Sequence, residues 1–397
     1  MINLASRDIA NGLGRFIATG VGLGLRIGVT LTMTGVYRGM SDDARAFLRS
    51  TGADVWVVQQ HTLGPFAESS TLHDDAYRSI LGLPGVSETG NVTFLTTQVR
   101  RGDGTVRVMI AGFEPGKPGE PAFLVAGRPI TRSHYEALAD VETGFRIGER
   151  IRIRRHDYTV VGLTRRMVTF GGDPIVFIPL RDAQGAQFLK DNEAIHNDRE
   201  RLAANPRINR PGAADTLDAV EELLTSNHNV NAVLVRTAEG WSPREVADTI
   251  KRWKHLQAFT DEEMEEILVG TVIARAARQI GLFLAILSFV SAAIVGFIIY
   301  SMTMAKLREI AVLKLIGTRN RTIAAMILQQ ALALGVIGFL VGRVAATLWG
   351  PIFPRYVLLL GEDTVRAFIL TMVACAAASL IGIRVALRVD PAEAIGG

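Results

Sequence analysis

The amino-acid sequence predicts an α+β membrane protein with four transmembrane helices, one followed by three, and a large extracytoplasmic α+β domain between helices 1 and 2. Two observations predict this fold class. The chain has four long apolar segments, and the long interval after the first contains alternating strand and helix patterns. The composition agrees, because a chain of 397 residues with 48% hydrophobic and 21% charged residues lies between a soluble enzyme and a pure membrane bundle.

Each apolar segment is long enough to cross the membrane as a helix, which takes about 20 residues for a hydrocarbon core of ~30 Å. The first is interrupted only by Arg26, and it is longer than the apolar region of a secretory signal, which has about 7 to 15 residues. We therefore interpret it as an uncleaved span. The predicted spans are residues 16–37, 280–304, 323–349 and 366–384.

Basic residues set the predicted orientation. The loop 305–322 carries five Lys or Arg residues against one acid, Glu309. An excess of Lys and Arg marks a short cytoplasmic loop. Basic residues also flank the spans at the amino-terminal segment 1–15 and at the tail 385–397, so we place both in the cytoplasm and the long interval outside.

The predicted extracytoplasmic domain, residues 38–259, combines strands and helices. We expect residues 112–211 to form an inserted β-rich subdomain, in which residues 191–211 form a surface loop or a disordered excursion. Residues 230–259 read as a strand, a helix and a strand. The predicted strands are 54–58, 92–100, 106–111, 150–154, 158–163, 175–178 and 232–235, and the predicted helices are 41–50, 74–81, 134–138, 216–225 and 243–253.

Residues 260–279 are predicted to form a stalk helix that continues into the second span. Thr260 is a favourable N-cap, acids follow it in the first turn, and Arg275 and Arg278 lie near the end, as the helix dipole favours. The segment contains no Pro and one Gly. The alternative is an ordinary helix that ends the domain and joins the span through a loose linker.

The basic loop 305–322 is predicted to contain a short docking helix. Around the helix, apolar and charged positions are mixed, which is untypical of a helix that lies on lipid. A helix that inserts into a groove of another protein fits this pattern, and a solvated connector is the alternative. Gly317 is a natural C-cap. The candidate contact residues are Arg308, Glu309, Lys314 and Gly317.

Glycines recur at intervals of four residues in two of the spans. Small residues at this spacing let neighbouring transmembrane helices approach closely. We therefore predict helix packing at Gly20, Gly24 and Gly28 in the first span, and at Gly338 and Gly342 in the third.

Arg26 is the charged residue inside the first span. Counted from Phe16, it lies ~15 Å deep, near the bilayer centre, where a charge is costly. None of the four predicted spans contains Asp or Glu, so neither this chain nor an identical copy offers an intramembrane carboxylate. We expect Arg26 to face a hydrated cleft or to contact substrate or lipid. The alternative is a long side chain that reaches the interface.

No catalytic or cofactor motif is present. The string from Gly112 to Pro118 lacks the spacing and the Ser or Thr of a P-loop, and HExxH, GxSxG and CxxC are absent. The single cysteine, Cys375, excludes an intrachain disulfide, and the seven histidines are scattered. No stripe of basic and aromatic residues indicates a nucleic-acid partner. We predict a non-enzymatic chain without a metal site.

One fairly specific string follows the second span: Arg308-Glu309-Ile310-Ala311-Val312-Leu313-Lys314-Leu315-Ile316-Gly317. Weaker strings are Gly52 to Val58, Gly127 to Ile130, Phe145 to Ile151, Tyr158 to Leu163 and Asp390 to Ala394. Together with the layout of one span followed by three, these strings resemble the FtsX-like, MacB-type permeases of ABC transporters, also called type VII, over nearly the whole chain. The compact form, without a fused ATPase, is similar to glycolipid exporters of the DevC type.

The resemblance implies a homodimer, or a pair with a similar permease, that works with two copies of a separate ABC ATPase in the cytoplasmic (inner) membrane of a bacterium. ATP and Mg would belong to that ATPase, and this chain would hold no cofactor. Arg308 to Gly317 would be the coupling helix. By mechanotransmission, the external domain would move a lipid-like or amphiphilic substrate, with a membrane-fusion adaptor as a further partner. The alternative is an FtsX-like regulatory module that transmits the state of the ATPase to an external hydrolase without transport.

Overall fold

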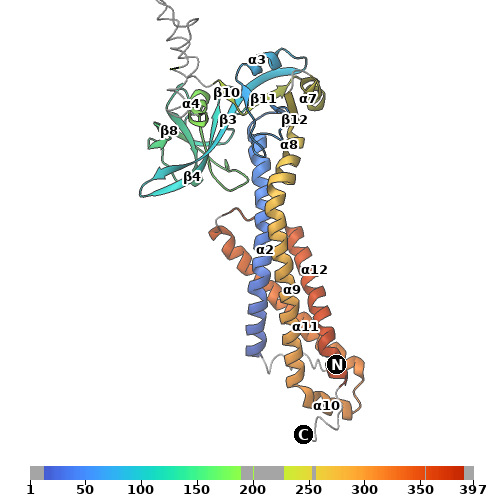
Figure 1. The fold of residues 1–397 in the computed structure, drawn as a ribbon. Coiled ribbons are helices and arrows are strands. Elements are labelled where there is room, and N and C mark those ends of the chain that lie inside the picture. The colour runs from blue at the N-terminus through green and yellow to red at the C-terminus, as the bar shows by residue number, and fades with distance from the viewer. Residues whose placement is uncertain (1–12, 189–199, 201–227, 253–255, 354, 389–397) are drawn as a thin grey trace, which may run out of the picture. The chain divides into compact units, whose positions relative to one another are not determined.

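The computed structural model describes two compact units, which we name the membrane unit and the sheet unit. The membrane unit extends up to Met40 and resumes at Arg275, and the sheet unit is Ser41–Ala274. The predicted helix 216–225 and the predicted loop 191–211 lie outside the described residues, except Glu200. The described residues are 13–188, 200, 228–252, 256–353 and 355–388 (Figure 1).

The membrane unit consists of helices. Among the described residues, four helices are long and apolar enough to cross a membrane, one before the sheet unit and three after it. Their outer surfaces carry large apolar side chains such as Phe289, which is 78% exposed, as expected of surfaces that face lipid. The elements are α2 (Leu13–Ser50), α9 (Ala274–Ala305), α10 (Leu307–Leu315), α11 (Asn320–Trp349), the short 3₁₀ helix η3 (Gly350–Ile352) and α12 (Gly361–Arg388).

Two helical runs are longer than the spans within them. Helix α2 continues past residue 37, where the first span was predicted to end. Residues 41–50, which were predicted as a separate helix, form the last part of α2. Thr260 caps α8 (Asp261–Ile267): its hydroxyl accepts from the amide of Glu263 at 3.2 Å, and the Glu263 carboxylate accepts from the amide of Thr260 at 3.1 Å. A π-helical turn, η2 (Leu268–Ile273), then connects α8 to α9. The chain is therefore helical from Asp261 to Ala305.

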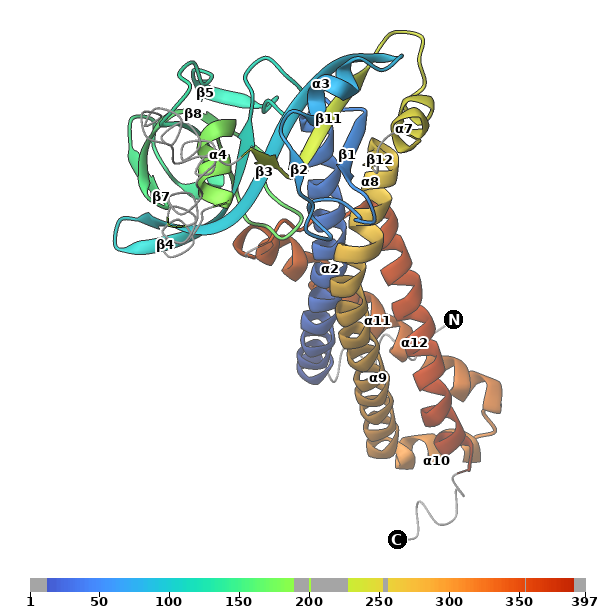
Figure 2. The ribbon, with the colours of Figure 1, turned by 45° about the horizontal axis from the view of Figure 1, so that its top comes forward.

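The sheet unit is built on one long strand, β3 (Val86–Arg101), which is shared by two parts of the sheet (Figure 2). Residues 86–92 of β3 pair with β11 (Ala232–Thr237), and residues 93–101 pair with β4 (Gly104–Phe113). The β-rich part therefore begins at Thr93, earlier than the predicted boundary at 112, because the second half of β3 and all of β4 belong to it.

The first part of the sheet contains the predicted strand-helix-strand unit. Helix α7 (Pro243–Lys251) connects β11 to β12 (Leu256–Thr260), and β1 (Val55–Gln59) lies between these two strands and pairs antiparallel with both. Helix α3 (Ala76–Leu81) contributes Ile80 to the same core. A separate two-stranded ribbon joins β2 (Leu72–His73) and β10 (Asn229–Val230).

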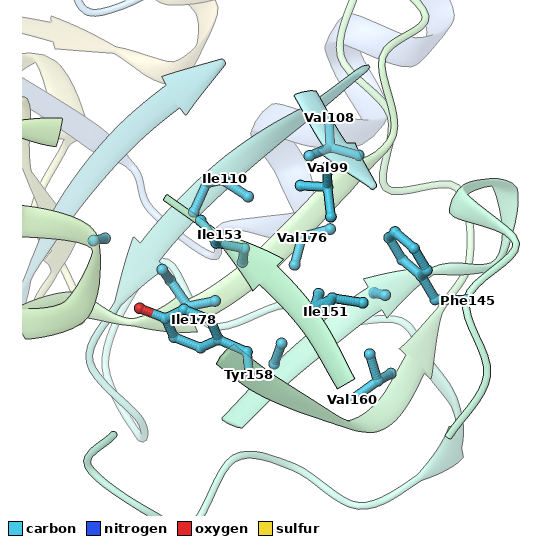
Figure 3. Close-up of a cluster of buried hydrophobic side chains, with 13 residues drawn as sticks. Val99, Val108, Ile110, Phe145, Ile151, Ile153, Tyr158, Val160, Val176 and Ile178 are labelled. Carbon is cyan, nitrogen blue, oxygen red and sulfur yellow. The ribbon is translucent and has the colours of Figure 1, made fainter. Parts of the chain in front are cut away.

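The second part of the sheet surrounds a separate apolar core (Figure 3). The strand order after β4 is β9, β6, β8 and β5, with β7 also paired to β8. Val108, Ile110, Tyr158 and Val176 are among its fully or almost fully buried side chains. The elements are β5 (Leu124–Gly127), β6 (Glu136–Asp140), η1 (Val141–Thr143), β7 (Arg150–Ile153), β8 (His156–Thr164), β9 (Ile175–Pro179) and α4 (Leu180–Gln187).

The helix predicted at 134–138 is wrong, since these residues lead into strand β6. All five residues of β6 are buried, and the strand lies between β8 and β9. Glu, Ala and Leu favour helix locally, but a position inside a sheet overrides that preference. Glu136 tolerates burial because it pairs with Arg128, with 2.5 Å between Oε1 and Nη2, and accepts from the amides of Thr131 and Arg132.

The Glu136 contacts predict an acid-dependent stability. The hydrogen bond from Arg128, aided by the amides of Thr131 and Arg132, lowers the pKa of Glu136 from 4.5 to about 2. The carboxylate therefore stabilises the fold above pH 4.5, and this contribution is lost as the pH falls through about 2. We expect Glu136→Gln to lower the free energy of unfolding by about 1–3 kcal/mol at pH 7.

Thermal unfolding of the full chain in detergent, followed from pH 7 to pH 2, checks this. The gap in Tm between wild type and Glu136→Gln should narrow as the solution becomes acidic. Glu239→Gln, at an exposed residue, serves as the control, and a gap that stays constant with pH contradicts the role assigned to Glu136.

Candidate functional site

Helix α10 presents a mixed apolar and charged face to the outside of the membrane unit. Ile310 and Ala311 are buried at 1% and 0% exposure. On the other side, Val312, Leu315 and Ile316 are exposed at 46%, 64% and 77%. Arg308 and Glu309 are also exposed. At about 100° per residue, these five exposed residues fall within one arc of about 120°.

Gly317 ends this helix in the way that the sequence predicts for a C-cap. Its φ of +88° lies in the left-handed region, which favours glycine. The amide of Gly317 donates to the carbonyl of Lys314 at 3.0 Å, and the amide of Thr318 donates to the carbonyl of Leu313 at 3.0 Å. These two bonds form a Schellman motif, which fixes where α10 stops.

Lys314 lies on a different side of α10 from Glu309. Its Nζ donates to the main-chain carbonyl of Leu387 at 2.9 Å, in the last turn of α12. A cation is favourable at that end of a helix, where carbonyls lack intrahelical partners. The structure therefore brings Arg308 and Glu309 together on the exposed face, and it uses Lys314 to hold α10 against α12.

The two predicted glycine sets face each other across α2 and α11. A Cβ atom added to Gly24 would lie 2.8 Å from the carbonyl oxygen of Gly338, and one added to Gly342 would lie 2.6 Å from the carbonyl oxygen of Gly24. A Cβ atom added to Gly28 would lie 3.1 Å from the carbonyl oxygen of Gly342, and one added to Gly20 would lie 2.8 Å from Cγ2 of Ile337. The backbones of the two helices thus approach to a distance that only glycine permits.

A second close contact, between the other end of α2 and the segment 356–359, was not predicted from the sequence. Gly35 and Gly39 pack against the segment 356–359, and the amide of Leu358 donates to the carbonyl of Gly35 at 3.0 Å. Close by, Arg38 donates from Nε and Nη2 to the two carboxylate oxygens of Asp363, both at 3.1 Å. The sequence could have predicted this contact, because Gly35 and Gly39 are four residues apart, as are the glycines of the first set.

The contacts of α2 define the level of Arg26 along α11. Gly24 lies against Val341 and Gly28 against Gly342, so Arg26 is level with this part of α11. At 1.5 Å per residue, Val341 is about 30 Å from Arg321 and only about 12 Å from Trp349. Along the helix axis, Arg26 is therefore closer to the level of Trp349 than to that of Arg321. Its depth in a bilayer, obtained by counting from Phe16, stays a prediction.

Three of the histidines that the structure describes, His73, His134 and His228, lie beside carboxylates. Nδ1 of His134 is 2.6 Å from Asp182, and Nδ1 of His228 is 3.2 Å from Asp74. These pairs connect loops and strand ends. Among the residues that the structure describes, no group of three or more His, Cys, Asp or Glu side chains is arranged to hold a metal ion.

The glycine contact predicts a position-specific packing defect. Gly24→Leu would force a side chain into Gly338 and Val341, and overpacking of this kind costs about 1–3 kcal/mol. Gly22→Leu is the matched control, because a Cβ atom at Gly22 meets no atom within 4 Å. We expect Gly24→Leu to lower the Tm of the detergent-solubilised chain and Gly22→Leu to leave it unchanged. Equal effects at both positions contradict the packing role.

Comparisons with known proteins agree on one family. Residues 16–253 match the MacB-like periplasmic core domain, and residues 281–391 match the FtsX-like permease C-terminal family. Two uncharacterized ABC transporter permeases of Mycobacterium tuberculosis (strain ATCC 25618 / H37Rv) are 26% and 24% identical to this chain over 397 residues, which is 100% of this chain and of each relative.

Two solved structures were also found. The extracellular domain of the noncanonic ABC-type transporter YknZ from Gram-positive bacteria has a TM-score of 0.34 and 10% identity, and covers 52% of this chain and 100% of that one. The periplasmic region of MacB from Actinobacillus actinomycetemcomitans has a TM-score of 0.36 and 9% identity, and covers 56% and 95%. Together, the two family matches span both units, and the chain belongs to the FtsX-like, MacB-type permeases of ABC transporters.

Proposed function

We propose that this chain is the permease subunit of an ATP-driven exporter and that α10 is the helix on which a separate cytoplasmic ABC ATPase docks. The observation that carries the proposal is the exposed face of α10. Leu315 and Ile316 are 64% and 77% exposed at the end of the membrane unit that carries the basic loop. Exposed apolar side chains rimmed by charges are typical of a protein interface.

The charges on this face suit a partner groove. Glu309 and Arg308 flank Val312, so a docked protein would seat the apolar side chains and pair with the charges at the rim. The Schellman motif at Gly317 and the bond from Lys314 to Leu387 hold α10 in a fixed orientation without the partner. Arg308, Glu309 and Gly317 therefore serve the docking contact directly, and Lys314 positions it.

A docked ATPase would transmit force through continuous helix. Only Lys306 separates α9 from α10, and the chain is helical from Ala305 back to Asp261. Closure of the ATPase on ATP would move α10 and, with it, α9 and α8. This is mechanotransmission, and it needs no passage of substrate through the helices. ATP and Mg belong to the ATPase in this account, and the permease is not catalytic and has no metal site.

We infer a lipid-like or amphiphilic substrate, taken from the membrane or the periplasm, and a homodimer with two ATPase copies in the inner membrane of a bacterium. A membrane-fusion adaptor is a further partner. The two mycobacterial relatives are described as permeases, which supports the permease role and no finer assignment. The alternative function is an FtsX-like regulatory module, which would use the same α10 contact to control an external hydrolase.

Charge reversal on α10 tests the docking site. Glu309→Lys should reduce co-purification of the ATPase by about tenfold or more, since it removes a charged contact and adds a like charge. The matched control is Glu362→Lys, because Glu362 is also exposed but starts α12 at the opposite side of the membrane. Unchanged ATPase binding by Glu309→Lys, with the fold intact, contradicts the docking role.

The same variants separate the two functions. Glu309→Lys in a cell should abolish export of a labelled membrane lipid if the chain is an exporter. Normal lipid export together with loss of an external hydrolase activity supports the regulatory alternative and contradicts the exporter.

A further inference from the structure

We propose that Arg26 binds the phosphate of a membrane lipid in the half of the bilayer away from α10. This inference deepens the proposed function. Lipid binding at Arg26 is argued independently, and only the step from bound lipid to exported lipid rests on the proposed exporter function. It starts from the guanidinium group itself. Nη1 and Nη2 of Arg26 are buried, and neither has a hydrogen-bond partner among the described residues.

The membrane unit offers no counter-charge at the level of Arg26. Its described carboxylates are Glu309, Glu362 and Asp363. Asp363 is already paired with Arg38, and Glu362 lies 3.7 Å from Arg366. Glu309 is on α10, beyond the other end of α11. A second copy of the chain brings the same residues, so its described membrane unit holds no carboxylate at this level either.

The cost of this arrangement points to an external anion. A guanidinium buried without a partner costs several kcal/mol, and charges inside membrane proteins are found paired or beside water. The planar guanidinium donates two parallel hydrogen bonds to a phosphate, which makes phosphate a better match than a single-point acceptor. The unpaired Nη1 and Nη2 are the two atoms that such a contact uses.

The surroundings favour a lipid over a free phosphate. Val21 and Leu25 on α2 are 38% and 43% exposed, and they form an apolar stripe with Gly22 that borders Arg26. A ligand therefore approaches Arg26 along a surface that favours acyl chains. Arg26 is level with a point on α11 that lies about 12 Å along the helix from Trp349. From there, the long side chain can extend toward the headgroup region at the Trp349 end of α11.

Lipid binding to the full-length permease in detergent tests this, with native mass spectrometry as the readout. The probes are phosphatidic acid, diacylglycerol with the same acyl chains and inorganic phosphate. We expect wild type to retain phosphatidic acid about tenfold better than diacylglycerol, and inorganic phosphate not to compete. Arg26→Gln should lose this preference, and Arg26→Lys, which keeps the charge but not the planar fork, should retain part of it.

Arg343→Gln is the matched control, since Arg343 is level with Gly28 but its Nη1 already donates to Thr347 at 3.2 Å. It should keep the preference for phosphatidic acid. Full retention of that preference in a folded Arg26→Gln variant overturns the proposal. Competition by inorganic phosphate overturns the lipid as the source of the anion. Because no ATPase is present, failure here leaves the docking role of α10 untouched, and failure of the Glu309 test leaves lipid binding untouched.

Discussion

The close approach of α2 and α11 is the constraint on which the membrane unit depends. Glycines on both helices remove the side chains that would otherwise separate the backbones, so van der Waals contact replaces the hydrophobic driving force that lipid does not provide. This contact also fixes the register of α2 along α11. The register sets the level of Arg26, and it brings Arg38 to Asp363 and Gly39 to Tyr356 at the other end.

The distribution of charge follows from the same arrangement. Carboxylates in the described membrane unit lie at or beyond the ends of the spanning helices, and two of the three are already paired with arginines. Within the described membrane unit, Nη1 and Nη2 of Arg26 are buried without a hydrogen-bond partner, and Val312, Leu315 and Ile316 of α10 are exposed. Our two proposals assign a lipid phosphate to Arg26 and a partner surface to α10.

Sequence patterns predicted the spans, most strands and the glycines at helix contacts because each rests on local periodicity or composition. They did not predict that the two glycine sets face each other. They failed where tertiary position decides. The residues of β6 favour helix locally, and only their place between β8 and β9 makes them a strand. The inward role of Lys314 and the level of Arg26 along α11 depend on contacts with α12 and α11, far away in sequence. The Arg38 to Asp363 pair joins residues separated by 325 positions.

We propose that α10 couples this permease to a separate ATPase, and native mass spectrometry of the tagged chain, gently extracted from its own membrane, tests this coupling. We expect a complex that contains two copies of the chain and two copies of a P-loop ATPase. Recovery of the chain without any ATPase, under conditions in which its dimer and bound lipids survive, would contradict it.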